Sequence, residues 1–261
     1  MLKSDYQRAV KDFTQAIHLK GDFSAAYSNR CLAYLQLEDY HNAIADCDQA
    51  INFVPSNVEA YLNRGIAYHR QGDYQAAIAD HNQAIAIQPH NFKAYYNRGV
   101  AHAMLGEYQH AISDYNVALT QIPQTSDTLV ADIYNDRGLA RFQLSDLNAA
   151  VLDFSKAILL NPDDYRGYYN RGCVCGRRGD RFHAISDFTA SLKLHPTNAH
   201  AYLNRGIAYH QLGYEQAAIS DLQTADQYFI EQGEEAAHEQ TISFLKKIQE
   251  PLQFISQIAL L

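Results

Sequence analysis

The sequence is short of several residue types that mark particular classes of protein. Its 261 residues include no tryptophan, two methionines, six prolines and four cysteines. Four cysteines are too few for a disulfide-stabilised scaffold of this size. Basic residues are outnumbered too, with 21 lysines and arginines against 29 aspartates and glutamates. The net charge of −8 argues against nucleic acid as a partner, because nucleic-acid binding depends on neutralising phosphates.

Long apolar runs are missing as well. The first twelve residues alternate charged and apolar types and contain no apolar core of a signal peptide. The apolar stretch at 252–261 is too short to cross a bilayer. We therefore expect a cytoplasmic chain without a membrane span. The sequence also lacks a glycine-rich phosphate loop and a nucleophile elbow, so we expect neither an enzyme nor a cofactor.

What the sequence has instead is an internal repeat of 34 residues with one slip of five. Asparagine or aspartate is followed by arginine at 30, 64, 98, 137, 171 and 205. Prolines at 55, 89, 123, 162 and 196 follow the same spacing. Aspartates also follow this spacing and occupy one equivalent position, or column, of the repeat, at 12, 46, 80, 114, 153, 187 and 221. A shared period in several residue types indicates an architecture of stacked structural repeats.

Each period contains two helical patterns. In the second complete unit, Tyr61, Arg64 and Tyr68 fall on one face of a helix. Gly72 then interrupts the pattern, and a second amphipathic stretch follows until Pro89. Each unit is therefore predicted to be two antiparallel helices joined by a tight turn.

These residues carry a family resemblance. The run Ala60-Tyr61-Leu62-Asn63-Arg64-Gly65-Ile66-Ala67-Tyr68, followed by Gly72-Asp73-Tyr74 and closed by Pro89, resembles the tetratricopeptide repeat, or TPR. The resemblance covers roughly residues 5–230, and its Asn-Arg-Gly form is similar to TPR proteins common in cyanobacteria. It implies an all-α fold, a right-handed α-solenoid of antiparallel helix pairs.

The period divides the chain into six predicted repeats with atypical ends. The repeats are expected at 22–55, 56–89, 90–123, 124–162, 163–196 and 197–230. Residues 1–21 match a second helix only, which indicates either a half repeat or a chain cut from a longer protein. Residues 231–250 are predicted to form a capping helix that Pro251 ends, and 251–261 an apolar tail. The five extra residues after Pro123 either start the next helix early, at Ser126 or Asp127, or lengthen the loop.

The arginine and aspartate columns predict a structural ladder. Each arginine lies on the stripe that packs inward, and the aspartates lie beside the apolar stripe of the second helix. The planar guanidinium can meet a carboxylate with two parallel hydrogen bonds and tolerates partial burial. The members assigned to this structural role are Arg64, Arg98, Arg137, Arg171, Asp80, Asp114, Asp153 and Asp187.

The candidate partner-binding residues follow from the resemblance, which implies that the first helices line a concave groove. Asparagine offers donors and acceptors to a peptide backbone, and tyrosine is common at interface hot spots. The predicted groove residues are Lys93, Tyr96, Asn97, Arg166, Tyr169, Asn170, Asn63 and Asn204. Four of them, Lys93, Asn97, Arg166 and Asn170, resemble the carboxylate clamp of some chaperone-binding TPR domains. Asp136 stands where that clamp has asparagine, and its charge would repel a carboxylate.

Histidine and cysteine do not suggest a metal site. The twelve histidines are scattered, and none lies in a His-Glu-x-x-His motif. Cys173 and Cys175 point in opposite directions on a helix, so they cannot share a metal ion. Cys31 and Cys47 occupy packed columns of one unit, and two packed thiols are expected there rather than a disulfide.

The predicted function is that of a non-enzymatic scaffold or adaptor. A rigid groove would hold a peptide or helix of a partner protein, and its preorganisation would limit the entropy lost on binding. The alternative is an oligomerisation or spacer module of a larger protein or assembly. The incomplete first repeat and the apolar tail, through which the chain could self-associate, favour that alternative.

Overall fold

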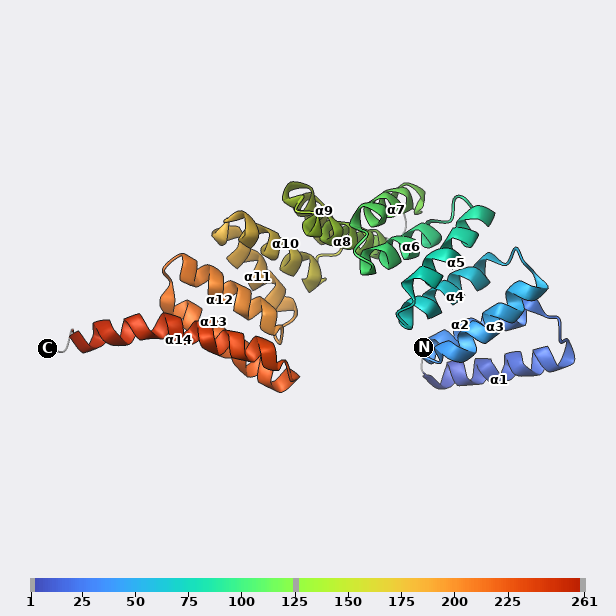
Figure 1. Cartoon of the computed structure of the whole chain (residues 1–261), viewed down its shortest axis with the longest axis horizontal. Coiled ribbons are helices and arrows are strands. Elements are labelled where there is room, and N and C mark those ends of the chain that lie inside the picture. The colour runs from blue at the N-terminus through green and yellow to red at the C-terminus, as the bar shows by residue number, and fades with distance from the viewer. Residues whose placement is uncertain (1–2, 124–126, 259–261) are drawn as a thin grey trace. The chain divides into compact units, whose positions relative to one another are not determined.

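The computed structural model describes the backbone of residues 3–123 and 127–258, and the side chains up to residue 249. Within these ranges the chain forms fourteen α-helices and no strand, so the all-α prediction is confirmed. The helices fall into two compact units, and the boundary in the chain lies between residues 126 and 127. Figure 1 labels the helices and colours them along the chain.

The first unit contains seven helices, in which a single helix precedes three antiparallel pairs (Figure 1). In chain order they are α1 (Lys3–Leu19), α2 (Ser24–Gln36), α3 (Tyr40–Phe53), α4 (Val58–Arg70), α5 (Tyr74–Ile87), α6 (Phe92–Met104) and α7 (Tyr108–Gln121).

The second unit also contains seven helices, with a single helix at its end instead of its beginning. They are α8 (Asp127–Gln143), α9 (Leu147–Leu160), α10 (Tyr165–Arg178), α11 (Arg181–Leu194), α12 (Ala199–Gln211), α13 (Glu215–Gln232) and α14 (Glu235–Ile258).

Caps and turns fix the ends of each pair. Asn57 begins α4 because its side chain accepts a hydrogen bond from the backbone N–H of Ala60. Gly72 closes the turn after α4 with a φ of 84°, in the left-handed region that favours glycine. Asp73 then caps α5 by accepting from the N–H of Ala76. The Gly-Asp dipeptide therefore ends one helix and starts the next.

The inserted residues before the fourth complete repeat lengthen its first helix. Helix α8 begins at Asp127 and has 17 residues, against 13 in α6. Gln124 to Ser126 lie outside the described residues.

One predicted boundary is wrong. Pro251 was expected to end the last helix, but α14 continues through it to Ile258. Proline removes one backbone donor and crowds the preceding turn, which disfavours a helix without forbidding it. The side chains of the predicted tail, from residue 250 on, lie outside the described part of the chain.

The two helices of a pair approach closely at a glycine. A Cβ placed on Gly99 would lie 2.8 Å from the ring of Tyr115, and one on Gly138 would lie 2.7 Å from Phe154. Both ring residues come sixteen positions after their glycine, and both rings are buried. Any larger residue at the glycine would have to displace a packed ring, so the close packing of the pair depends on the glycine–ring match.

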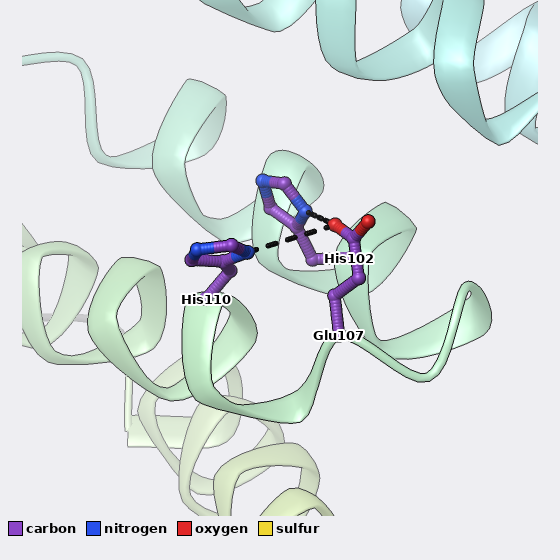
Figure 2. Close-up of side chains that lie close together, drawn as sticks. All are labelled: His102, Glu107 and His110. Atoms are coloured by element: carbon purple, nitrogen blue, oxygen red, sulfur yellow. Dashed lines mark hydrogen bonds and ion pairs between the residues drawn. The ribbon is translucent and has the colours of Figure 1, made fainter.

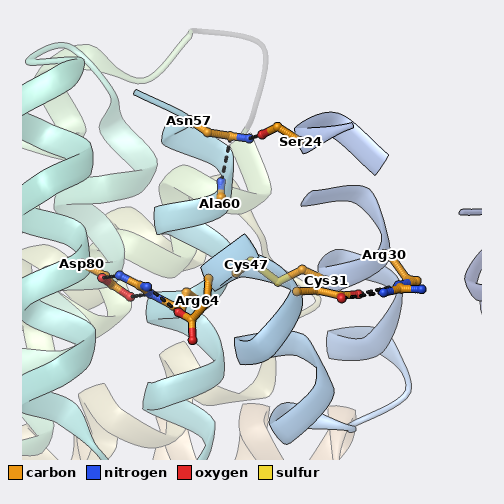
Figure 3. Close-up of a disulfide and its surroundings, with 10 residues drawn as sticks. Ser24, Arg30, Cys31, Cys47, Asn57, Ala60, Arg64 and Asp80 are labelled. Atoms are coloured by element: carbon orange, nitrogen blue, oxygen red, sulfur yellow. Dashed lines mark hydrogen bonds and ion pairs between the residues drawn. A yellow bond between two sulfur atoms is a disulfide. The ribbon is translucent and has the colours of Figure 1, made fainter. Parts of the chain in front are cut away.

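In the first pair, a disulfide takes the place of the glycine and the ring. Cys31 and Cys47 occupy these two positions, again sixteen residues apart, and are joined by a disulfide (Figure 3). Both are completely buried. The prediction of two packed thiols is therefore wrong, because packing brings the two columns into direct contact. Disulfides persist mainly in oxidising compartments. The bond therefore does not support the expected cytoplasmic location, which stays a prediction.

The arginines and aspartates form the same pair in all six repeats. Each guanidinium donates from Nε and Nη2 to both carboxylate oxygens of the aspartate sixteen residues later. The pairs are Arg30–Asp46, Arg64–Asp80, Arg98–Asp114, Arg137–Asp153, Arg171–Asp187 and Arg205–Asp221. The aspartate side chains are only 3–9% exposed and those of the arginines 13–26%. The pairs are thus largely removed from water.

The remaining guanidinium nitrogen links successive repeats. Nη1 of Arg64 lies 2.5 Å from a carboxylate oxygen of Asp48, and Nη1 of Arg98 donates to Asn82 at 2.6 Å. Both acceptors lie on the second helix of the preceding repeat. The same bond joins Arg30 to Thr14, Arg171 to Ser155 and Arg205 to Thr189. Each of these five arginines therefore binds two helices besides its own.

We expect Arg98→Ala to lower the free energy of unfolding by about 3 kcal/mol, because it leaves the buried Asp114 carboxylate without its partner. Urea unfolding followed by circular dichroism would measure the loss. The control is Arg178→Ala, which removes an exposed arginine with no ion-pair partner among the described residues and should change stability by less than about 0.5 kcal/mol. Equal stability of the two variants would contradict the structural role of the ladder.

We also expect the disulfide to stabilise the first pair by about 3 kcal/mol, given the sequence separation of sixteen between its cysteines. A reducing agent should therefore lower the stability of the wild-type chain. The double variant Cys31→Gly, Cys47→Tyr recreates the Gly99–Tyr115 arrangement and should be insensitive to the reductant. Equal sensitivity of the two proteins would show that the bond is not responsible.

Candidate binding faces

The first helices of successive repeats form a continuous face in each unit. Helix α4 contacts both α2 and α6 in the first unit, and α10 contacts both α8 and α12 in the second. We call these the inner faces of the two units. The predicted groove residues divide between them. Asn63, Lys93, Tyr96 and Asn97 belong to the first unit, and Arg166, Tyr169, Asn170 and Asn204 to the second.

On the first inner face, the predicted polar residues differ in their exposure. Lys93 is exposed and has no ion-pair partner among the described residues. It borders an open pocket together with Glu59, Pro89 and Phe92. Asn97 is half-buried in a second pocket. Asn63 is only 7% exposed, so the structure places this predicted groove residue inside the fold and not on the accessible face.

The second pocket of this face has a volume of about 390 Å³ and lies between α4 and α6, against α5. It is lined by Ile66, His69, Arg70, His81, Tyr96, Asn97 and Val100. His81 occupies the ring position opposite Gly65 and is 1% exposed. Nδ1 of His81 and Nε2 of His69 are buried without a hydrogen-bond partner in the described part of the chain. Such groups are rare in folded proteins, because an unpaired buried nitrogen costs free energy.

Burial of His81 has an electrostatic consequence. Desolvation, with smaller contributions from His69 and Arg98, lowers its pKa from 6.5 to about 3. Desolvation also lowers the pKa of His69. Both imidazoles are therefore neutral at pH 7, and each neutral ring has one nitrogen that donates and one that accepts.

On the second inner face, the predicted residues are brought together but are bonded to one another. Arg166, Tyr169 and Asn170 line one pocket of about 440 Å³. Nη2 of Arg166 lies 2.6 Å from Asp132 and 2.6 Å from Asp164, so two carboxylates already neutralise this guanidinium.

The neutral polar side chains of this face are also hydrogen-bonded to one another. Asn170 donates to Asn135 at 2.9 Å, and Asn204 donates to the hydroxyl of Tyr169 at 3.2 Å. The ring of Tyr169 packs against Phe188. Together with the paired Arg166, these bonds argue against a clamp for a free carboxylate on this face.

The structure also brings together three residues that the sequence analysis did not single out. His102, Glu107 and His110 meet at the turn between α6 and α7 (Figure 2). A His-Glu-x-x-His motif places its ligands on a single helix, whereas these three residues come from both sides of a turn. The spacing His-x4-Glu-x2-His across a Gly-containing turn would have been the signal.

None of the described helices is long and apolar enough to span a bilayer. The paired helices, the repeated arginine–aspartate bonds and the inner faces define a helical repeat protein. Models of the TPR repeat match residues 32–72, 67–106, 92–125, 131–164 and 176–228. The chain belongs to the tetratricopeptide repeat family, which supports a protein-interaction scaffold in general.

Several solved structures share the fold at low sequence identity. YrrB, described as a TPR protein with an unusual peptide-binding site, is 21% identical, with a TM-score of 0.58 over 70% of this chain and 91% of YrrB. MamA from Desulfovibrio magneticus RS-1 is 21% identical, with a TM-score of 0.61 over 67% of this chain and 96% of that one. PilF of Pseudomonas aeruginosa is 17% identical, with a TM-score of 0.70 over 86% and 99%.

We expect the stability of the first unit to fall as the pH is lowered through the range between 6.5 and about 3, because the unfolded chain protonates His81 there and the folded chain does not. The loss between pH 7 and pH 5 should be on the order of 2 kcal/mol, with His69 adding in the same direction. His81→Phe should reduce this dependence, because phenylalanine already fills the same column at Phe154.

Urea unfolding of the wild-type chain, His81→Phe and the exposed-site control His90→Gln at the two pH values would measure this effect. The control should retain the wild-type dependence. A wild-type stability that is the same at both pH values would refute the assignment to His81.

Proposed function

We propose that this chain is a scaffold whose first inner face binds an extended segment of a partner protein. The observation that carries the proposal is the open pocket between α4 and α6, which is lined by the half-buried side chains of Tyr96 and Asn97. Nδ1 of His81 and Nε2 of His69 are buried in the walls of this pocket, so a bound segment would contact Tyr96 and Asn97 rather than these nitrogens.

The charge of this face indicates the chemistry of the segment. Lys93 is an exposed cation without an ion-pair partner in the described part of the chain, and it lies on the same helix as Asn97. An acidic side chain of the partner would find its countercharge at Lys93, and its backbone would find a donor and an acceptor at Asn97. The half-buried ring of Tyr96 supplies apolar contact between them.

The second inner face is a weaker candidate for a charged ligand. Arg166 would have to leave Asp132 or Asp164 before it could bind a new carboxylate. The description of YrrB as a peptide-binding TPR protein adds support for a peptide ligand in general, without indicating which residues of this chain bind it.

Selection of peptides from a random display library against the full chain tests the proposal. We expect selected peptides to carry acidic residues, and Lys93→Glu or Asn97→Ala to weaken their binding about tenfold or more. Lys156→Glu reverses an exposed charge on the second helix α9 and serves as the matched control. Arg166→Glu reports whether the second inner face contributes.

Retained affinity in Lys93→Glu together with Asn97→Ala would refute binding at the first inner face. A loss of peptide affinity in Arg166→Glu alone would place the binding site on the second inner face. Absence of any enriched peptide would refute the proposal of a peptide ligand.

We also propose, as the second candidate, that the chain self-associates through its C-terminal segment. This is favoured by α14, which has 24 residues against 18 in α13 and continues past the predicted cap. Sedimentation of the full chain beside a chain ending at Glu250 separates the two functions. Leu245 and Ile248, which pack against Leu222, are retained in the shorter chain. A monomer in both cases would refute this candidate.

A further inference from the structure

The turn between α6 and α7 gathers three side chains of the types that bind transition metals (Figure 2). His102 lies near the end of α6, Glu107 precedes α7, and His110 lies in the first turn of α7. Nδ1 of His102 is 2.6 Å from Oε2 of Glu107, and Nδ1 of His110 is 3.7 Å from the same oxygen. One ligand atom from each residue lies within 4.8 Å of the other two.

We propose that His102, Glu107 and His110 form a binding site for a zinc ion. Two imidazoles and a carboxylate are an established ligand set for zinc, which then has a fourth position for water. Tetrahedral bonds of about 2 Å hold ligand atoms about 3.3 Å apart, which lies between the 2.6 Å and 3.7 Å that separate the two histidine nitrogens from Oε2 of Glu107. His110 and Glu107 are 73% and 41% exposed, so their side chains can adjust without moving the packed interior.

The behaviour of Glu107 at the start of α7 is a second, independent observation. In the same position of other repeats, Asp39, Asp73, Asp146 and Asp180 cap their helices by accepting a backbone N–H. Glu107 makes no such bond. Its longer side chain turns its carboxylate toward the two histidines (Figure 2). The helix therefore lacks a side-chain cap at this position, and the carboxylate is directed into the cluster instead.

The outer surroundings of His102 also suit a metal ligand. Its Nε2 lies 3.9 Å from Oδ2 of Asp114, the aspartate that Arg98 holds with two hydrogen bonds. A histidine that binds a metal through one nitrogen commonly directs the other toward a carboxylate, which orients the ring. The ladder thus places a fixed carboxylate near the other nitrogen of the proposed ligand, at a separation longer than a hydrogen bond.

The fifth complete repeat offers a natural comparison. Cys175, Asp180 and His183 occupy the positions of His102, Glu107 and His110. His183 pairs with Asp180 at 2.7 Å, but Cys175 is buried. Among the described residues, three metal-binding side chains converge only at the α6–α7 turn. His183→Ala is therefore a matched control for His110→Ala.

Titration of the full, metal-free chain with Zn²⁺ in competition with a chromophoric chelator tests the proposal. We expect one equivalent to bind, and His110→Ala, Glu107→Gln or Glu107→Asp to weaken its binding about tenfold or more. Glu107→Asp keeps the charge and can restore the cap, so weaker zinc binding by this variant would report ligand geometry rather than net charge. His183→Ala should bind zinc as the wild-type chain does.

Thermal unfolding gives a second readout, because zinc bound only to the folded chain raises its melting temperature. We expect this rise in the wild-type chain and in His183→Ala but not in His110→Ala. Absence of stoichiometric binding, or equal losses in His110→Ala and His183→Ala, would overturn the proposal. Unchanged binding in Glu107→Gln would exclude the carboxylate as a ligand and refute the three-residue site.

Discussion

The interaction on which the rest of the structure depends is the bond of each arginine to its aspartate. Two guanidinium nitrogens donate hydrogen bonds to both carboxylate oxygens of an aspartate on the partner helix. In five repeats the third guanidinium nitrogen, Nη1, donates to a side chain of the preceding repeat. The bond therefore acts within and between repeats at the same time. Because the fork of arginine is planar and its directions are fixed, the bond sets the register of the helices as well as holding them together.

This regular interior limits where a repeat can differ from its neighbours. A glycine faces a ring at the same place in four repeats and faces Leu222 in the last, so most substitutions there would open a cavity or cause overlap. The exceptions are therefore informative. Cys31 and Cys47 replace that contact with a covalent bond, and His81 replaces the ring with one that carries two nitrogens. Both changes fit the available space, and both add chemistry that the other repeats lack.

The same reasoning separates the candidate sites from the scaffold. Lys93 is exposed and has no ion-pair partner among the described residues, whereas Arg166 is exposed but already neutralised. Exposure alone is therefore a poor guide to binding on these faces. At the α6–α7 turn, Glu107 is the acidic residue of the capping column that does not cap its helix.

The sequence by itself determined the helix pairs, because the caps, the turn glycines and the apolar spacing act over a few residues. It also determined the columns, since a period of 34 residues places equivalent residues in equivalent contacts. Only the tertiary structure decided which column members touch across helices. The distance between Cys31 and Cys47, the two carboxylates on Arg166 and the meeting of His102 with His110 depend on how separate helices pack, and a pattern along one helix carries no information about that separation.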